Sequence, residues 1–182
     1  HFDTSTARWS ISGRPQFAID FNYDLSGPGP WAFNGGPWGN HNYHAYTYDP
    51  ARKRLVYIRD EHTHLYDPVQ RQWSHDERLS DNPFYGSKYT SYLTGTPEGA
   101  VVWALRQRGS FESGIWKLTS KGWLPLKTSG EPLPRPVTDG STITLDSKRN
   151  RLLLTTTQGE KDIQHSGQVW SCDLETGVVK RL

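Results

Sequence analysis

Three stretches of the chain share one pattern of apolar and polar positions. Each begins with a short run rich in β-branched or aromatic residues, passes through a polar turn and ends in a second apolar run. The stretches are 44–58, 90–104 and 141–155. In the first and third, the turn begins at Asp49 and Asp146, and aspartate favours turns because its side chain bonds to the backbone just ahead. The pattern predicts three β-hairpins.

Further strands are expected after each hairpin. Tyr66 precedes Trp73 by seven residues, and Trp116 precedes Trp123 by the same spacing. An apolar run at 169–174 follows the third hairpin. The repeated unit therefore has four short strands.

The interval between the units indicates which all-β architecture to expect. Ala45, Ser91 and Thr142 hold matching positions, at intervals of 46 and then 51 residues. A four-stranded unit that recurs every ~40–50 residues is typical of a β-propeller blade. We expect an all-β fold.

The N-terminus carries half of such a unit, because Phe2 precedes Trp9 by the same seven residues. We expect residues 1–16 to be the outer hairpin of a blade whose inner strands are missing. The whole chain, 1–182, is then one partial propeller domain of about three and a half blades. The predicted parts are the hairpin at 1–16, an insertion at 24–40 and blades at 41–80, 86–126 and 137–182. Known rings hold roughly four to eight blades, so a further polypeptide segment or chain is expected to complete this one.

Three segments of the chain carry a further pattern. They are the Pro-Leu-Pro-Arg-Pro run at 132–136, the Leu-Asp-Ser-Lys-Arg-Asn-Arg-Leu run at 145–152 and the Val-Trp-Ser-Cys-Asp-Leu-Glu-Thr-Gly run at 169–177. Together they resemble the kelch repeat. Thr155 and Thr156 stand where kelch repeats usually carry paired glycines. The resemblance covers nearly the whole chain and implies a kelch-type propeller, in a larger ring such as the seven-bladed rings frequent among kelch relatives.

Composition excludes several classes of function. The 182 residues hold 21 Lys and Arg against 19 Asp and Glu, a formal charge of +2, which argues against a nucleic-acid-binding tail or a polybasic membrane anchor. The mean hydropathy is −0.77, and no apolar run is long enough to span a bilayer. Cys172 is the single cysteine, expected to be a small buried side chain. The absence of methionine suggests a processed product or a fragment.

The insertion at 24–40 is rich in glycine and proline and carries Trp31 and Trp38. Long ordered loops in compact domains are often functional. The alternative is a hydrophobic plug that covers the edge of a blade.

Four of the seven histidines fall within 24 residues. His41 and His44 lead into the first strand of a predicted blade, and His62 and His64 are expected at its second-to-third turn. These stations share one face of a propeller. In the next blade the matching stations hold Tyr89 or Tyr92, and Arg106 or Arg108.

A set of His, Tyr and Arg lining a groove suits removal of the proton beside a uronate carboxylate. A cation, best a bidentate arginine, masks the carboxylate charge. A histidine or tyrosine moves the proton. Trp31 and Trp38 could stack on sugar rings.

The order and spacing of these residues resemble the propeller-type ulvan lyases. That resemblance implies β-elimination on a uronate-containing, sulfated polysaccharide, by a secreted or periplasmic protein. Carried over, the catalytic set is His44, His64, Tyr92 and Arg108. The substrate-binding set is Trp31, Trp38, His41, Tyr89 and Arg106.

Other interpretations stay open. Kelch repeats are mostly binding scaffolds, so the alternative function is a non-catalytic glycan- or protein-binding propeller. We expect no cofactor; the alternative is a divalent metal held by histidines of the cluster with Asp60. A copper radical site is disfavoured, because Cys172 belongs to a third strand away from the histidines. The basic turns at 52–54 and 148–151 are expected to be solvated.

Overall fold

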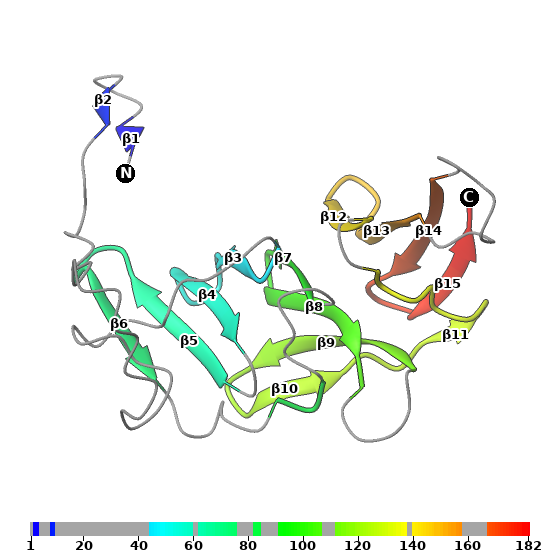
Figure 1. Ribbon diagram of the computed structural model, residues 1–182, viewed down its shortest axis with the longest axis horizontal. Helices are drawn as coiled ribbons and strands as arrows, with labels where there is room; N and C mark the ends of the chain where they lie inside the picture. The colour runs from blue at the N-terminus through cyan, green and yellow to red at the C-terminus, as the bar shows by residue number, and fades with distance from the viewer. Residues whose placement is uncertain are drawn as a thin grey trace, which may run out of the picture.

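The computed structural model describes residues 2–3, 8–9, 44–59, 62–75, 82–84, 91–106, 112–137, 140–157 and 167–182. These residues form strands, turns and extended segments, with no helix among them (Figure 1). The all-β prediction is therefore confirmed. Nothing in the described part of the chain is a helix long and apolar enough to cross a membrane.

The N-terminal strands are β1 (Phe2–Asp3) and β2 (Arg8–Trp9), which pair antiparallel with Phe2 opposite Trp9. The first sheet follows, antiparallel throughout and in the order β3-β4-β5-β6. Its strands are β3 (Tyr46–Asp49), β4 (Arg54–Arg59), β5 (His62–Asp67) and β6 (Gln72–His75).

The second sheet has the same order of strands. These are β7 (Tyr92–Thr96), β8 (Gly99–Leu105), β9 (Ser113–Thr119) and β10 (Gly122–Pro125).

The third sheet has five strands where four were predicted. It consists of β12 (Ser141–Asp146), β13 (Arg151–Thr156), β14 (Gln168–Asp173), β15 (Val178–Arg181) and β11 (Ser129–Gly130). The added strand β11 runs parallel to β15 at the edge. It pairs through main-chain hydrogen bonds, from Ser129 N to Gly177 O and from Glu131 N to Val179 O. Because these groups are common to all residues, no hydrophobic pattern in the sequence predicts the strand.

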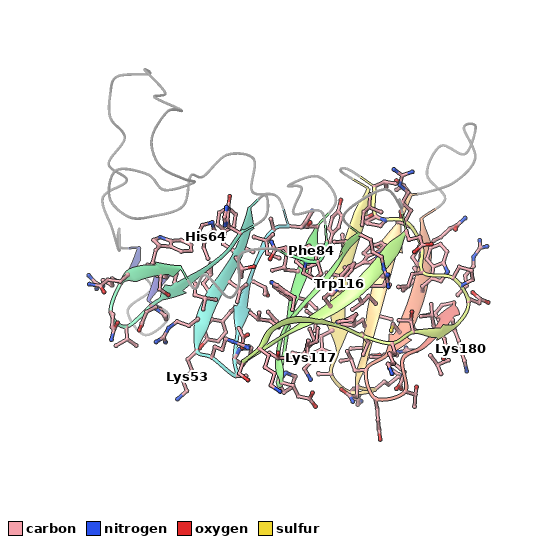
Figure 2. All side chains as sticks on the ribbon, turned by 90° about the horizontal axis from the view of Figure 1, so that it is seen from below. Lys53, His64, Phe84, Trp116, Lys117 and Lys180 are labelled. Atoms are coloured by element: carbon pink, nitrogen blue, oxygen red, sulfur yellow. The ribbon has the colours of Figure 1, made fainter. Side chains whose placement is uncertain are left out.

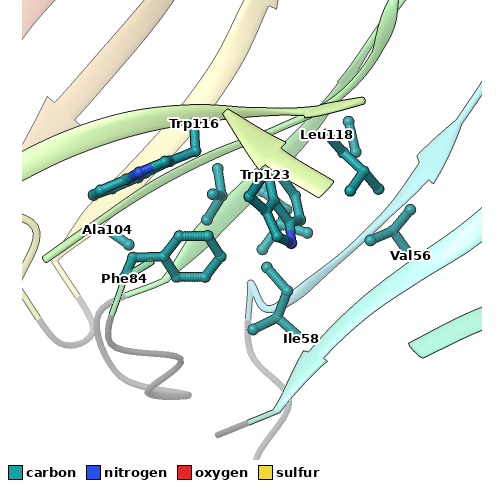
Figure 3. Close-up of a cluster of buried hydrophobic side chains, with 10 residues drawn as sticks. Val56, Ile58, Phe84, Ala104, Trp116, Leu118 and Trp123 are labelled. Atoms are coloured by element: carbon teal, nitrogen blue, oxygen red, sulfur yellow. The ribbon is translucent and has the colours of Figure 1, made fainter. Parts of the chain in front are cut away.

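The three sheets pack face to face, and their first strands β3, β7 and β12 lie side by side (Figure 1). Two core clusters separate the sheets. The first interface, between the first and second sheets, contains Val56, Ile58, Phe84, Leu93, Ala100, Val102, Ala104, Trp116, Leu118 and Trp123 (Figure 3). The second interface, between the second and third sheets, contains Tyr92, Val101, Trp103, Ile115, Ile143, Leu152, Leu154, Trp170, Cys172 and Val179.

The repeat is real, but its register along the first strands differs by one residue from the prediction. Asp49, Thr96 and Asp146 each end a first strand at the last cross-strand pair, which gives intervals of 47 and 50 residues instead of 46 and 51. Lys53 and Asn150, each four residues after its aspartate, both have a left-handed backbone (φ 53° and 49°). The second sheet lacks this turn, because only two residues separate Thr96 from its partner in β8.

The seven-residue aromatic spacing has two structural meanings. Tyr66 and Trp73 lie directly opposite each other, with ring centroids 5.1 Å apart. Trp123 lies opposite Leu118, not Trp116. The turn between β5 and β6 holds four residues and that between β9 and β10 only two, so equal spacing gives a different register.

The basic turns are not simply solvated. Their arginines pair with aspartates that end β3, β5 and β12. The ion pairs are Arg52–Asp49 at 2.7 Å, Arg54–Asp67 at 2.8 Å, Arg151–Asp146 at 3.0 Å and Arg149–Asp146 at 3.3 Å. Three aspartates therefore balance half of the six positive charges that the two turns carry.

Candidate functional site

Two residues of the predicted catalytic set meet where the first strands of two sheets adjoin. His44 immediately precedes the buried Ala45 and β3, and Tyr92 begins β7. Their rings stack with centroids 5.1 Å apart and an interplanar angle of 29°. The backbone N–H of Leu93 donates to the carbonyl of His44 at 3.0 Å, which holds the two strand starts together. His44 is exposed, so its imidazole can reach a ligand in solution.

The side chain of Tyr92 is fixed by contacts other than its stack with His44. Its side chain is 2% exposed, and its hydroxyl donates to the carbonyl of Val137 at 2.5 Å. Its ring lies 5.8 Å from that of Trp103, whose indole N–H donates to Ser113 Oγ and to the carbonyl of Pro134. The hydroxyl proton of Tyr92 is thus engaged by the main chain, and the residue supports the His44 ring.

His62 and His64 lie within β5, not in the turn before it. Both project from the same face of the strand, with ring centroids 6.3 Å apart. His64 is 0% exposed and lies opposite Tyr57 of β4, with centroids 5.9 Å apart. Figure 2 shows His64 toward the end of the sheets opposite Lys53. A polymer cannot contact a ring that is buried to this extent.

Arg106 is the one member of the predicted arginine pair that the structure describes. It is exposed, follows β8 directly and forms an isolated bridge with Phe84. Its N–H donates to the carbonyl of Glu112 at 2.9 Å. Five other predicted site residues, and the insertion at 24–40, lie outside the described residues. They are Trp31, Trp38, His41, Tyr89 and Arg108.

A metal site finds no support in the described part of the chain. No three His, Cys, Asp or Glu side chains there lie close enough to hold a metal ion. Cys172 is buried on β14, as expected. Burial, and secondarily the negative charge of Asp173, raises the pKa of this thiol to about 11.

The residues that support Tyr92 were missed by sequence reasoning. Trp103 lies in the apolar run of β8, where it reads as one more core residue. The proline-rich segment around Pro134 was noticed only as part of the kelch resemblance. The available signal was the co-occurrence of a buried tryptophan, whose N–H needs a partner, and a segment of prolines whose carbonyls can supply one.

No family model matches the chain, and no curated protein matches it.

Proposed function

We propose that the chain is a segment of a kelch-type β-propeller that cleaves acidic, uronate-containing polysaccharide by β-elimination. The observation that carries the proposal is the stack of an exposed His44 on a firmly held Tyr92. The propeller architecture is supported by three successive sheets, antiparallel except for the edge pair β11 and β15, whose first strands adjoin one another. Further β-sheets, from another segment or chain, complete the ring, and the protein works in the secreted or periplasmic space where such polymers occur.

In the proposed reaction, the neutral imidazole of His44 takes the proton from the sugar carbon that bears the carboxylate. The electron pair of that C–H bond forms a carbon–carbon double bond, and the glycosidic C–O bond breaks. The imidazolium formed on His44 then gives this proton to the leaving oxygen, which keeps the electron pair of the broken C–O bond, so that His44 is neutral again at the end of the step. Histidine suits the base role because its charge changes near neutral pH.

The negative charge that develops on the uronate needs a cation beside it. Arg106, exposed at the end of β8, and Arg108, two residues further along the chain, are the proposed partners of the carboxylate. Arginine binds a carboxylate through two parallel hydrogen bonds, and its contribution grows as the charge develops. Tyr92 is proposed to position His44 and not to move the proton, because its hydroxyl donates to Val137 O.

The same hydrogen bond favours a second candidate, a non-catalytic glycan-binding propeller. A tyrosine bound to the main chain is rigid, and rigid aromatic supports suit binding surfaces. In this case His44 contacts a sugar or its acidic group without transferring a proton.

The test is formation of unsaturated uronate product, followed by its ultraviolet absorbance, on ulvan and other uronate polysaccharides. Substitution His44→Ala should lower the rate by about 100- to 10,000-fold, the usual effect of removing an acid–base group. Tyr92→Phe keeps the stack and should lower the rate by roughly tenfold or less. Tyr48→Phe is the matched control, since Tyr48 is an exposed ring on β3.

Absence of product on every substrate, together with saturable polysaccharide binding that His44→Ala weakens, would establish the second candidate. If neither product formation nor polysaccharide binding is observed, both candidate functions are rejected.

A further inference from the structure

The two interfaces differ at the end of the sheets where the first and second strands of each sheet turn. At the first interface this space is filled. Asp49 is 0% exposed, and its Oδ2 accepts hydrogen bonds from the backbone N–H of Ala100 at 3.0 Å and from Arg52 at 2.7 Å. Arg52 Nη1 lies only 3.1 Å from where a Cβ on Gly99 would be. A carboxylate and a guanidinium thus occupy the gap.

At the second interface the corresponding groups are missing from the second sheet. Thr96 stands at the strand end in place of Asp49, and the two-residue turn that follows has no counterpart of Arg52. A cavity of about 120 Å³ is left here between the second and third sheets.

The lining of this cavity combines an apolar floor with a charged rim. Val101, Ile115, Leu126 and Leu174 form the floor. Lys117 and Glu98 form an ion pair at the rim, with side chains 33% and 74% exposed. Figure 2 shows Lys117 at the end of the sheets opposite His64, so the cavity is separate from the proposed polysaccharide face.

We propose that this cavity binds a free α-amino acid with a branched aliphatic side chain, such as leucine. The carboxylate of the ligand pairs with the Lys117 ammonium, and its ammonium pairs with the Glu98 carboxylate. The side chain enters the space above the four aliphatic residues of the floor. A volume of about 120 Å³ holds roughly four waters in the liquid, which matches the four carbons of a leucine side chain.

The zwitterion is favoured over a singly charged ligand for an electrostatic reason. A ligand with only a carboxylate pairs with Lys117 and so takes Lys117 away from Glu98. A ligand with only an ammonium pairs with Glu98 and so takes Glu98 away from Lys117. An amino acid exchanges one ion pair for two. Because exposed ion pairs are individually weak, the apolar side chain supplies most of the affinity, and we expect a Kd of about 1–10 mM.

The experiment is a titration of the full chain with L-leucine, followed by NMR of the methyl groups of Val101, Ile115, Leu126 and Leu174. We expect saturable shifts of these methyl signals. Alanine should bind at least roughly tenfold more weakly, because it lacks three of the buried carbons. Isocaproate and isoamylamine, which each keep one charge and the branched chain, should each bind roughly three- to fivefold more weakly than leucine.

Two surface substitutions test the rim, and neither removes a core side chain. Glu98→Gln and Lys117→Met should each weaken leucine binding by roughly three- to fivefold. The matched controls, Glu175→Gln and Lys121→Met, change exposed residues outside the cavity lining and should leave the Kd unchanged.

Absence of saturable shifts would overturn the proposal. Equal binding of leucine and alanine would also overturn it, since the floor would then contribute nothing. Isocaproate or isoamylamine binding as tightly as leucine would reject the zwitterion.

Discussion

The first and second interfaces belong to the same repeat but are held together by different chemistry. In both, a tryptophan indole N–H is linked by hydrogen bonds to the segment that joins two sheets, through Thr63 at the first interface and directly at the second. At the first interface, Trp123 donates to Thr63 Oγ1 at 2.8 Å, and Thr63 donates to the side-chain oxygen of Asn82 at 2.8 Å. At the second, Trp103 donates to the main-chain carbonyl of Pro134 at 3.2 Å.

The side chains that pack around these hydrogen bonds also differ between the two interfaces. At the first interface, Phe84 meets Trp116 and Trp123 with ring centroids 5.1 and 5.3 Å apart (Figure 3). The second is mostly aliphatic on the side of the third sheet, with Leu152 and Leu154 fully buried. A repeat therefore conserves the place of a contact between sheets more strictly than the groups that make it. Side-chain acceptors make the first interface depend on particular residues, whereas carbonyl acceptors make the second depend on the path of the main chain.

The most damaging single change should be Trp103→Ala, because Trp103 is 0% exposed and both packs and donates at the second interface. Truncation of a buried tryptophan costs about 3–5 kcal/mol of unfolding free energy. Urea unfolding followed by circular dichroism measures this loss. The comparison variant is Trp73→Ala, whose side chain is only half-buried on the first sheet and should cost less. A loss below about 1 kcal/mol for Trp103→Ala would contradict a central role for this anchor.

A smaller loss is expected from Asp49→Asn at the first interface. The substitution keeps the shape and one acceptor oxygen but removes the charge that pairs with Arg52. Loss of a charge-assisted buried hydrogen bond costs about 1–3 kcal/mol. Asp146→Asn is the matched control, because Asp146 ends β12 in the same way but has a partly exposed side chain that pairs with arginines. Equal losses from the two variants would mean that the deeper burial of the Asp49 charge adds nothing to its contribution.

These effects bear on how far the fold could be predicted from the sequence. The hairpins starting at Tyr46 and Ser141 follow from local rules: side chains alternate between faces with period two, and aspartate begins a turn. The one-residue error in register arose at the second hairpin, where Thr96 and Gly99 close a two-residue turn that neither neighbour has. The parallel pairing of β11 (Ser129–Gly130) uses main-chain groups that every residue carries, so it has no signature.

The candidate site was also predictable only in part, because the repeat predicts which residues hold matching positions but not which main-chain groups they bond to. The repeat predicted that His44 and Tyr92 hold matching positions in two successive units, and the structure brings their rings together. The partner of the Tyr92 hydroxyl, Val137 O, lies 45 residues away and is a carbonyl like any other. Alternation places His64 on one face of β5, but does not reveal which face is covered, so its burial was not foreseen.

Acid should act on three aspartates that lie at the turns of the first and third sheets. The pKa values of Asp67, Asp146 and Asp173 all lie below their ordinary 3.8. The main cause is the backbone N–H of Gln70 for Asp67, the side chain of Arg151 for Asp146, and the backbone N–H of Thr176 for Asp173. Because the folded pKa is depressed, this stabilisation is complete above about pH 5 and is lost as the pH falls through the folded pKa values.

Unfolding free energies measured between about pH 7 and pH 2.5 should therefore decline only in the acid part of the range. Replacement of the three aspartates by asparagine should flatten that decline. Two of the three, Asp146 and Asp173, belong to the third sheet, so the double variant there should remove more of the pH dependence than Asp67→Asn. An unchanged acid slope in the triple variant would assign it to other groups.

The smallest disturbance is chemical labelling of Cys172, which reports on the second interface without changing it. The thiol is fully buried, and its pKa of about 11 leaves about one thiolate in a thousand at pH 8. The thiolate is the reactive form, so the native protein should react far more slowly than the protein unfolded in urea. Trp103→Ala should accelerate labelling, because it loosens the packing around β14, whereas Asp49→Asn should leave the rate at the native value. Acceleration by Asp49→Asn to the same degree would show that the two interfaces open as one cooperative unit, and their different chemistry would then have no counterpart in how the sheets separate.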